Sequence, residues 1–116
     1  MPLDMYAGIY VRDYATAKVW YALLLGSEPS YVATPTEAVW ELAEYRSIFI
    51  EQNAAHAGHS IVSLFVEDFD IRVAQISARG LEPTERLTYR NGVRKALYHD
   101  PDGNEIGFGG APLAAD

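Results

Sequence analysis

The chain has 116 residues, of which 49% are apolar and 22% charged, with a net charge of −7 and no cysteine. This composition is typical of one soluble globular domain, and the acidic balance argues against nucleic acid as a partner. The absence of cysteine removes disulfides, thiolate chemistry and cysteine-type zinc sites. No apolar run approaches the ~20 residues that cross a membrane, and the first residues lack the features of a secretory signal. We therefore expect a cytoplasmic protein without a membrane span.

The first half predicts a strand, a helix and three further strands. In the first strand, residues 5–12, Ile9 and Val11 share one face while Tyr6 and Tyr10 share the other. Apolar residues at helical spacing predict a helix over 15–25, with Gly26 ending it. Alternation and the turn at Thr34-Pro35-Thr36 place the other strands at 29–34, 37–43 and 46–52.

The second half repeats this order after a linker rich in alanine, glycine and histidine at 53–60. A strand is predicted at 61–67 and a helix at 70–79, with Asp70 as its candidate N-cap. The remaining predicted strands are residues 83–90, 93–99 and 104–109.

The two halves align on each other. Val11-Arg12-Asp13-Tyr14 matches Val66-Glu67-Asp68-Phe69 at an offset of 55, and Gly26-Ser27-Glu28-Pro29 matches Gly80-Leu81-Glu82-Pro83 at an offset of 54. The sequence therefore predicts one α+β domain over 1–116, made of two βαβββ modules at about 5–52 and 61–110. Helices on one face of each sheet would leave the other face free to form a cup.

The segment Tyr98 to Phe108 predicts a strand, a tight turn and a strand. Pro101 fixes φ, Asp102 can bond its own backbone and Gly103 supplies a positive φ. This Asp-Pro-Asp-Gly-Asn turn follows Val11-x-Asp13 and Val66-x-Asp68, each of which precedes a predicted helix. In these motifs and their order the sequence resembles members of the vicinal oxygen chelate superfamily, which includes glyoxalases, bleomycin resistance proteins and extradiol dioxygenases. The resemblance implies paired βαβββ modules in a cupped mixed sheet around a ligand cavity, with the helices outside, and it implies a homodimer.

The resemblance also implies four positions at which metal-dependent members carry ligands. Counting from the matched aspartates and from the turn gives Tyr6, Ile61 and Gly107, and the remaining position, on the fourth strand, falls at or near Phe49. A divalent transition metal needs imidazole, carboxylate or thiolate donors, and none of these residues supplies one. We therefore predict no metal and no other cofactor.

An apolar, aromatic cavity would replace the metal centre, and strand alternation suggests its lining. Each lining residue could equally be core or dimer interface. The predicted ligand-binding residues are Tyr6, Tyr10, Trp40, Phe49, Glu51, Ile61, Phe65, Tyr89 and Tyr98. Aromatic faces stack on planar or cationic groups, so the leading hypothesis is a non-enzymatic, drug- or metabolite-sequestering protein close to the bleomycin-resistance branch.

Two other hypotheses remain open. One is a lyase, isomerase or dioxygenase-like enzyme whose metal site is rearranged around His59, Glu51 and Glu105. The other is a regulatory module whose cup is filled by a neighbouring chain. No catalytic set of nucleophile, base and orienting group is apparent in the sequence.

Overall fold

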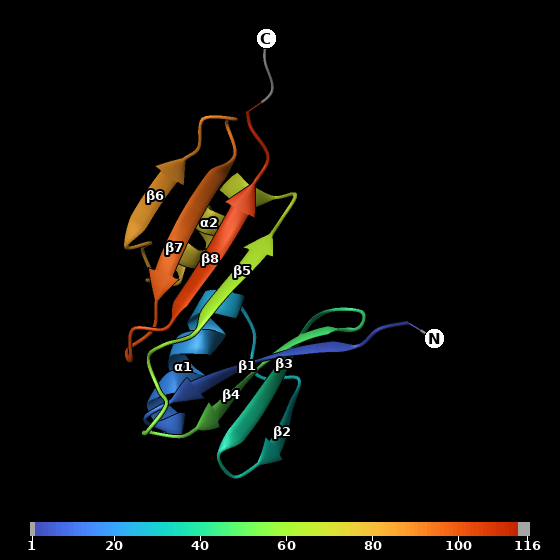
Figure 1. The fold of residues 1–116 in the computed structure, drawn as a ribbon, viewed down its shortest axis with the longest axis vertical. Coiled ribbons are helices and arrows are strands. Elements are labelled where there is room, and N and C mark those ends of the chain that lie inside the picture. Colours follow the sequence, from blue (N-terminus) through green and yellow to red (C-terminus); the bar gives the residue numbers. More distant parts are fainter. Residues whose placement is uncertain (1, 114–116) are drawn as a thin grey trace.

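The computed structural model describes residues 2–113 and contains the two predicted βαβββ modules in succession (Figure 1). The elements of the first module are β1 (Met5–Val11), α1 (Tyr14–Leu25), β2 (Tyr31–Thr34), β3 (Glu37–Ala43) and β4 (Arg46–Gln52). Those of the second are β5 (Ile61–Phe65), α2 (Phe69–Ala78), β6 (Glu85–Thr88), β7 (Arg94–His99) and β8 (Glu105–Gly110). The predicted α+β class and the repeat are confirmed, with element ends shifted by a few residues.

Each module forms its own four-stranded mixed sheet. The strand order is β1-β4-β3-β2 in the first, which we call sheet A, and β5-β8-β7-β6 in the second, sheet B. In both sheets the first strand pairs in parallel with the last, and the other pairings are antiparallel. No strand of sheet A pairs with one of sheet B within the described residues. β1 and β5 therefore each have one edge without a strand partner.

The helices begin and end differently in the two modules. Asp13 caps α1, since its carboxylate accepts the backbone N–H of Thr16, and Gly26 ends the helix at φ 83°, as predicted. Asp70 does not cap α2. The helix starts at Phe69, so Asp70 lies in its first turn, and its carboxylate instead accepts a 2.7 Å hydrogen bond from Arg94. The residue at the N-cap position is Asp68. The prediction chose Asp70 instead because an aspartate at either position favours a helix start.

The core lies between each helix and one face of its sheet. One buried cluster joins both modules: it contains Tyr21 and Leu24 of α1 with Ile9 and Ile50, and Ile76 of α2 with Ile106 and Phe108. This leaves the opposite face of each sheet without a covering helix (Figure 1). None of the helices within residues 2–113 combines the length and apolar character that a membrane span needs.

The turn between β7 and β8 joins the second module to the first. Asn104 is fully buried and donates a 3.0 Å hydrogen bond to the backbone oxygen of Tyr10, at the end of β1. Its side-chain oxygen accepts the backbone N–H groups of Gly58 and Ser60 in the linker. The turn that predicts the hairpin thereby also fixes how the modules meet.

Candidate functional site

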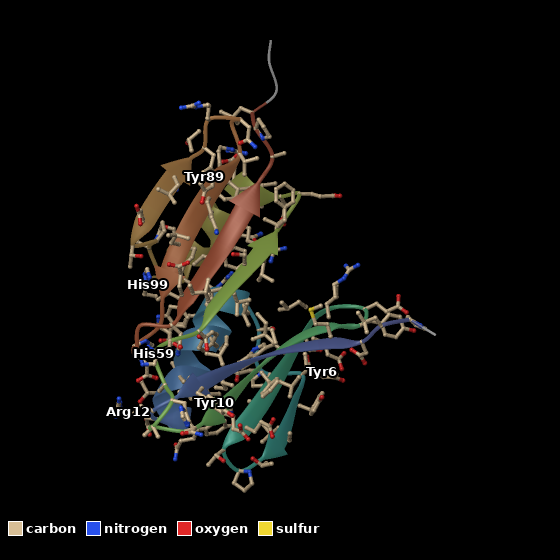
Figure 2. All side chains as sticks on the ribbon, in the orientation of Figure 1. Tyr6, Tyr10, Arg12, His59, Tyr89 and His99 are labelled. Atoms are coloured by element: carbon tan, nitrogen blue, oxygen red, sulfur yellow. The ribbon has the colours of Figure 1, made fainter. Side chains whose placement is uncertain are left out.

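The uncovered face of sheet A carries aromatic side chains from β1 and β4. Ile9 and Val11 point into the core, so Tyr6, Gly8 and Tyr10 point to the other side. Gly8 and Phe49 are in-register neighbours and share that face. Tyr6 and Tyr10 are 49% and 39% exposed, and both extend from β1 in Figure 2. This surface, which we call face A, is therefore available to a ligand or to another chain.

Gly8 allows the Phe49 ring to lie across β1. A Cβ at Gly8 would come within 2.4 Å of the ring atom Cζ of Phe49. Any larger residue there would displace the ring, because real Cβ atoms do not approach so closely. The half-buried Phe49 ring thus forms the floor of face A between the two tyrosines.

The uncovered face of sheet B, face B, is built in the same way. Val62 and Leu64 pack on the core, so Ile61, Ser63 and Phe65 point away from it. Ile61 is 72% and Phe65 is 67% exposed, which is far more than an apolar strand residue usually is in a closed sheet.

Lys95 crosses face B above Gly107. A Cβ at Gly107 would lie 2.8 Å from Cε of Lys95 and 3.6 Å from its amine. The lysine stem therefore occupies the space that a side chain at 107 would fill. From the sequence, Lys95 lies with Arg90 and Arg94 beside the Asn91-Gly92 turn, which favours a solvated surface residue, with an anion-contacting edge as the weaker alternative. Lys95 alternates with Leu97, which lies opposite Gly107, and this alternation is the signal that could have placed Lys95 on face B.

The structure separates the predicted lining residues into groups. Tyr6, Tyr10, Phe49 and Glu51 share face A, because Glu51 pairs with Tyr10 in register. Ile61 and Phe65 lie on face B. Tyr89 follows β6 at the far end of sheet B from Tyr6 and Tyr10 (Figure 2), where it borders a shallow depression with Arg90 and Asn91. Within one chain, these residues are therefore not gathered around a single cavity.

Trp40 and Tyr98 do not lie on the uncovered faces, and that prediction is wrong for both. Each is 1% exposed within the core, and the Trp40 indole N–H donates a 2.9 Å hydrogen bond to the backbone oxygen of Ser27. Each stands next to another apolar residue, Val39 or Leu97, so alternation alone could not decide which of the two points inward.

A groove of about 820 Å³ runs between the modules along the outer edge of β5. Consecutive residues 63–68 form one wall, and Trp40 and Leu42 of β3 contribute to the other. Ser63 and Phe65 belong both to this groove and to face B. The open edge of β5 and its exposed apolar face are therefore continuous.

Face A is acidic at the end where β1 begins. Asp4, Glu41 and Glu44 line a small depression of about 360 Å³ that also includes Tyr6. The hydroxyl of Tyr31 and then the Asp4 carboxylate hold the pKa of the Tyr6 phenol above its usual value. Tyr6 is therefore a neutral hydrogen-bond donor at physiological pH.

His99 lies between a hydroxyl and a carboxylate. Its Nδ1 is 2.6 Å from Oγ1 of Thr84, and its Nε2 is 3.5 Å from Oε1 of Glu105. Oγ1 of Thr84 also lies 3.1 Å from the backbone oxygen of Leu97, which can only accept a hydrogen bond. The single hydroxyl proton thus goes to Leu97, and Nδ1–H donates to the threonine oxygen. This geometry does not activate Thr84 as a nucleophile.

The residues present do not fit the metal site of metal-dependent relatives. Of the four implied positions, Tyr6 and Phe49 lie on face A and Ile61 and Gly107 on face B. The Lys95 stem lies over Gly107, where a ligand side chain would have to start. Within residues 2–113, no three His, Asp or Glu side chains are grouped to hold a metal, and the rearranged set of His59, Glu51 and Glu105 is therefore not assembled.

Comparison with known proteins gives the same fold. Residues 3–108 match the family model for the Glyoxalase/Bleomycin resistance protein/Dioxygenase superfamily. A glyoxalase / bleomycin resistance protein from Catenulispora acidiphila DSM 44928 superposes with a TM-score of 0.92 at 47% identity, covering 96% of this chain and 100% of that one. None of the curated proteins compared with the chain matches it.

More distant structures share the fold alone. A bleomycin-binding protein complexed with bleomycin superposes with a TM-score of 0.74 at 14% identity, covering 92% of this chain and 97% of that one. A lactoylglutathione lyase from Agrobacterium tumefaciens has a TM-score of 0.74 at 16% identity, with 92% of each chain covered. The match over residues 3–108 and the 47% identical relative show that the chain belongs to the glyoxalase/bleomycin resistance protein/dioxygenase superfamily.

Proposed function

We propose that the protein binds a small molecule without a metal and acts as a homodimer. The observation that carries this proposal is the chemistry of the uncovered faces. Where metal-dependent relatives place ligands, this chain has a phenol, two apolar side chains and a glycine beneath a lysine stem. Such a surface favours stacking and apolar contact over metal coordination.

The second copy of the chain would complete the site. β1 and β5 each have an unpaired edge, and strand edges that remain exposed favour association with another chain. Ile61 and Phe65 are largely exposed on face B, which a soluble monomer would not favour. We place face A of one subunit opposite face B of its partner, so that both faces line one cavity.

The ligand would be aromatic or drug-like. Tyr6, Tyr10 and Phe49 offer ring surfaces on face A, while Ile61 and Phe65 offer apolar surface on face B. Apolar walls with a few polar groups are typical of small-molecule sites. A distant structural neighbour holds bleomycin, so this fold accommodates such a ligand in that protein. Sequestration of an antibiotic or aromatic metabolite in the cytoplasm is the role we propose.

A thermal-shift screen of aromatic antibiotics and metabolites tests the binding proposal. A ligand that binds only the native state raises the melting temperature by mass action, by an amount that grows with ligand concentration. We expect at least one such compound to act equally with and without EDTA. Stabilisation by a stoichiometric transition metal, or by ligands only when that metal is present, would contradict the proposal.

Sedimentation equilibrium tests the dimer. Phe65→Glu places a charge on face B and should convert a dimer into a monomer, because burying an unpaired carboxylate is costly. Ile71→Glu is the matched control, since Ile71 is 62% exposed on α2. A wild-type monomer at micromolar concentration, or a dimer that Phe65→Glu leaves intact, would contradict the arrangement.

A further inference from the structure

We propose that Lys95 forms an anion-binding subsite within the ligand site, so that the bound molecule carries a carboxylate or a similar anionic group. This inference rests on the proposed function, because it requires that face B line the cavity. Lys95 and Lys18 are the two lysines of the chain, and Lys95 is the one on an uncovered sheet face.

The position of the amine is set by the backbone beneath it. Lys95 lies opposite Gly109 in register, but its stem leans toward Gly107, so the amine is above β8. Ser63 on β5 is the in-register neighbour of Gly107 and points to the same side. The amine and the Ser63 hydroxyl are therefore the polar donors that flank this glycine floor.

No carboxylate in the described part of the chain neutralises Lys95. Its in-register neighbours are Leu87 on β6 and Gly109 on β8, and neither is charged. Two acids also lie on face B: Glu105 lies beside His99, and Glu85 on β6 is in register with Leu97. Within residues 2–113, no acidic oxygen lies within 4 Å of the Lys95 amine. By contrast, five other basic side chains each lie within 4 Å of an acidic oxygen: Arg12, Arg72, Arg86, Arg94 and His99.

The surroundings of the Lys95 amine favour an anionic partner. Lys95 is half-buried, and Leu97, Leu87 and Phe65 supply apolar surface on the same face. A second subunit or a ring stacked on Phe65 would remove more water from the amine, and an ammonium group that loses water without a partner is destabilised. A ligand carboxylate would offset this cost through a charge-assisted hydrogen bond, with Ser63 available as a second donor.

The experiment compares acids with their neutral amides on the same rings. The pairs are benzoate with benzamide, 2-naphthoate with 2-naphthamide, and indole-3-acetate with indole-3-acetamide. Calorimetry measures their affinities for the wild type, for Lys95→Met, and for Lys18→Met as the matched control on α1. Methionine keeps most of the apolar stem over Gly107 and removes the charge.

We expect at least one acid to bind the wild type and Lys18→Met about tenfold more tightly than its amide, which is the scale of one charge-assisted contact. In Lys95→Met this preference should disappear. With lysines labelled as ¹³C-dimethyl-lysine, the acid should shift the Lys95 signal and leave that of Lys18 in place.

Equal binding of acid and amide to the wild type would overturn the subsite and leave the proposed function intact. A preference for the acid that survives Lys95→Met would also overturn it. If Lys95→Met dissociates the dimer and no acid shifts the Lys95 signal, the amine pairs with the partner subunit and the subsite is wrong. Failure of all six compounds to bind would count against both the subsite and an aromatic ligand.

Discussion

The Tyr21 hydroxyl donates a 2.8 Å hydrogen bond to the Asp100 carboxylate, across 79 positions of sequence and between the two modules. Both residues are buried, and the same oxygen of Asp100 accepts a second hydrogen bond from the Asn104 amide. Its other oxygen accepts the backbone N–H groups of Asp102 and Asn104. One buried carboxylate thus organises the β7–β8 turn and ties it to α1, so the modules keep a fixed relation.

Asp100→Asn should destabilise the fold by about 2–3 kcal/mol, because an amide nitrogen cannot accept the hydrogen bonds that one carboxylate oxygen now accepts. Urea unfolding followed by circular dichroism measures this loss. Glu67→Gln is the control, since Glu67 is exposed and should change stability by less than about 0.5 kcal/mol. A loss for Asp100→Asn no larger than that of the control would refute the role of the carboxylate.

Stability should fall steeply above about pH 10, the usual pKa of tyrosine. Burial first, and the nearby Asp100 carboxylate second, raise the pKa of Tyr21 far above that value in the folded state. The unfolded chain therefore releases the Tyr21 proton while the folded chain keeps it. Below pH 10 the stabilisation that the neutral Tyr21 phenol provides is fully present. Above pH 10 the free energy of unfolding falls by about 1.4 kcal/mol per pH unit from Tyr21 alone.

Urea midpoints measured from pH 8 to 11.5 check this slope, with Tyr21→Phe as the comparison. Phenylalanine cannot ionise, so the variant should be less stable at pH 8 but should lose less stability as the pH rises. Parallel curves for the two proteins would show that Tyr21 ionises alike in the folded and unfolded states.

Arg79 caps the helix of the other module. It follows α2, and its guanidinium donates a 3.1 Å hydrogen bond to the backbone oxygen of Leu24 and a further one to that of Leu23, at the end of α1. These are carbonyl groups without a partner in the helix itself. Arg79→Met should cost about 1–2 kcal/mol in chemical unfolding.

Arg90→Met is the control for Arg79, because Arg90 is an exposed arginine in the β6–β7 turn. We expect it to leave the unfolding midpoint nearly unchanged. If both variants lose the same stability, the loss reflects charge in general and not the cap.

Tyr98→Phe should leave stability unchanged or raise it by up to about 1 kcal/mol. Among the described residues, the Tyr98 hydroxyl is the buried side-chain atom without a hydrogen-bond partner, and burial raises the pKa of this phenol. Removing an unsatisfied hydroxyl removes its desolvation cost, while the ring keeps its edge-to-face contact with Phe108. A loss above 1 kcal/mol in thermal unfolding would reveal a partner for the hydroxyl.

The fold was predictable because its signals are local and occur twice. The aspartate before each helix, the glycine after it and the alternation of β1 and β5 each depend on a few neighbouring residues. The contacts of the Asp-Pro-Asp-Gly-Asn turn were not predictable in this way. Its partners Tyr10 and Tyr21 lie 94 and 79 positions away from Asn104 and Asp100, and turn chemistry carries no information about them.

The candidate site was predictable only where alternation has a single solution. Tyr6 and Tyr10 alternate with Ile9 and Val11, and their placement on face A agrees with the structure. Trp40 and Tyr98 stand beside other apolar residues, so packing against the helices, and not alternation, determines which face of the sheet they occupy. The position of the Lys95 stem over Gly107 could not be predicted, because Gly107 belongs to a different strand.

Calorimetric titration of a stabilising aromatic ligand in EDTA tests the central claim most directly, using the wild type, Tyr10→Ala, Phe65→Ala and the control Ile71→Ala. We predict metal-free binding that weakens at least tenfold when either Tyr10 or Phe65 is truncated, because each face supplies one wall of the site, and that Ile71→Ala leaves unchanged. Binding that EDTA abolishes, or that neither truncation affects, would contradict a metal-free site between the two sheet faces.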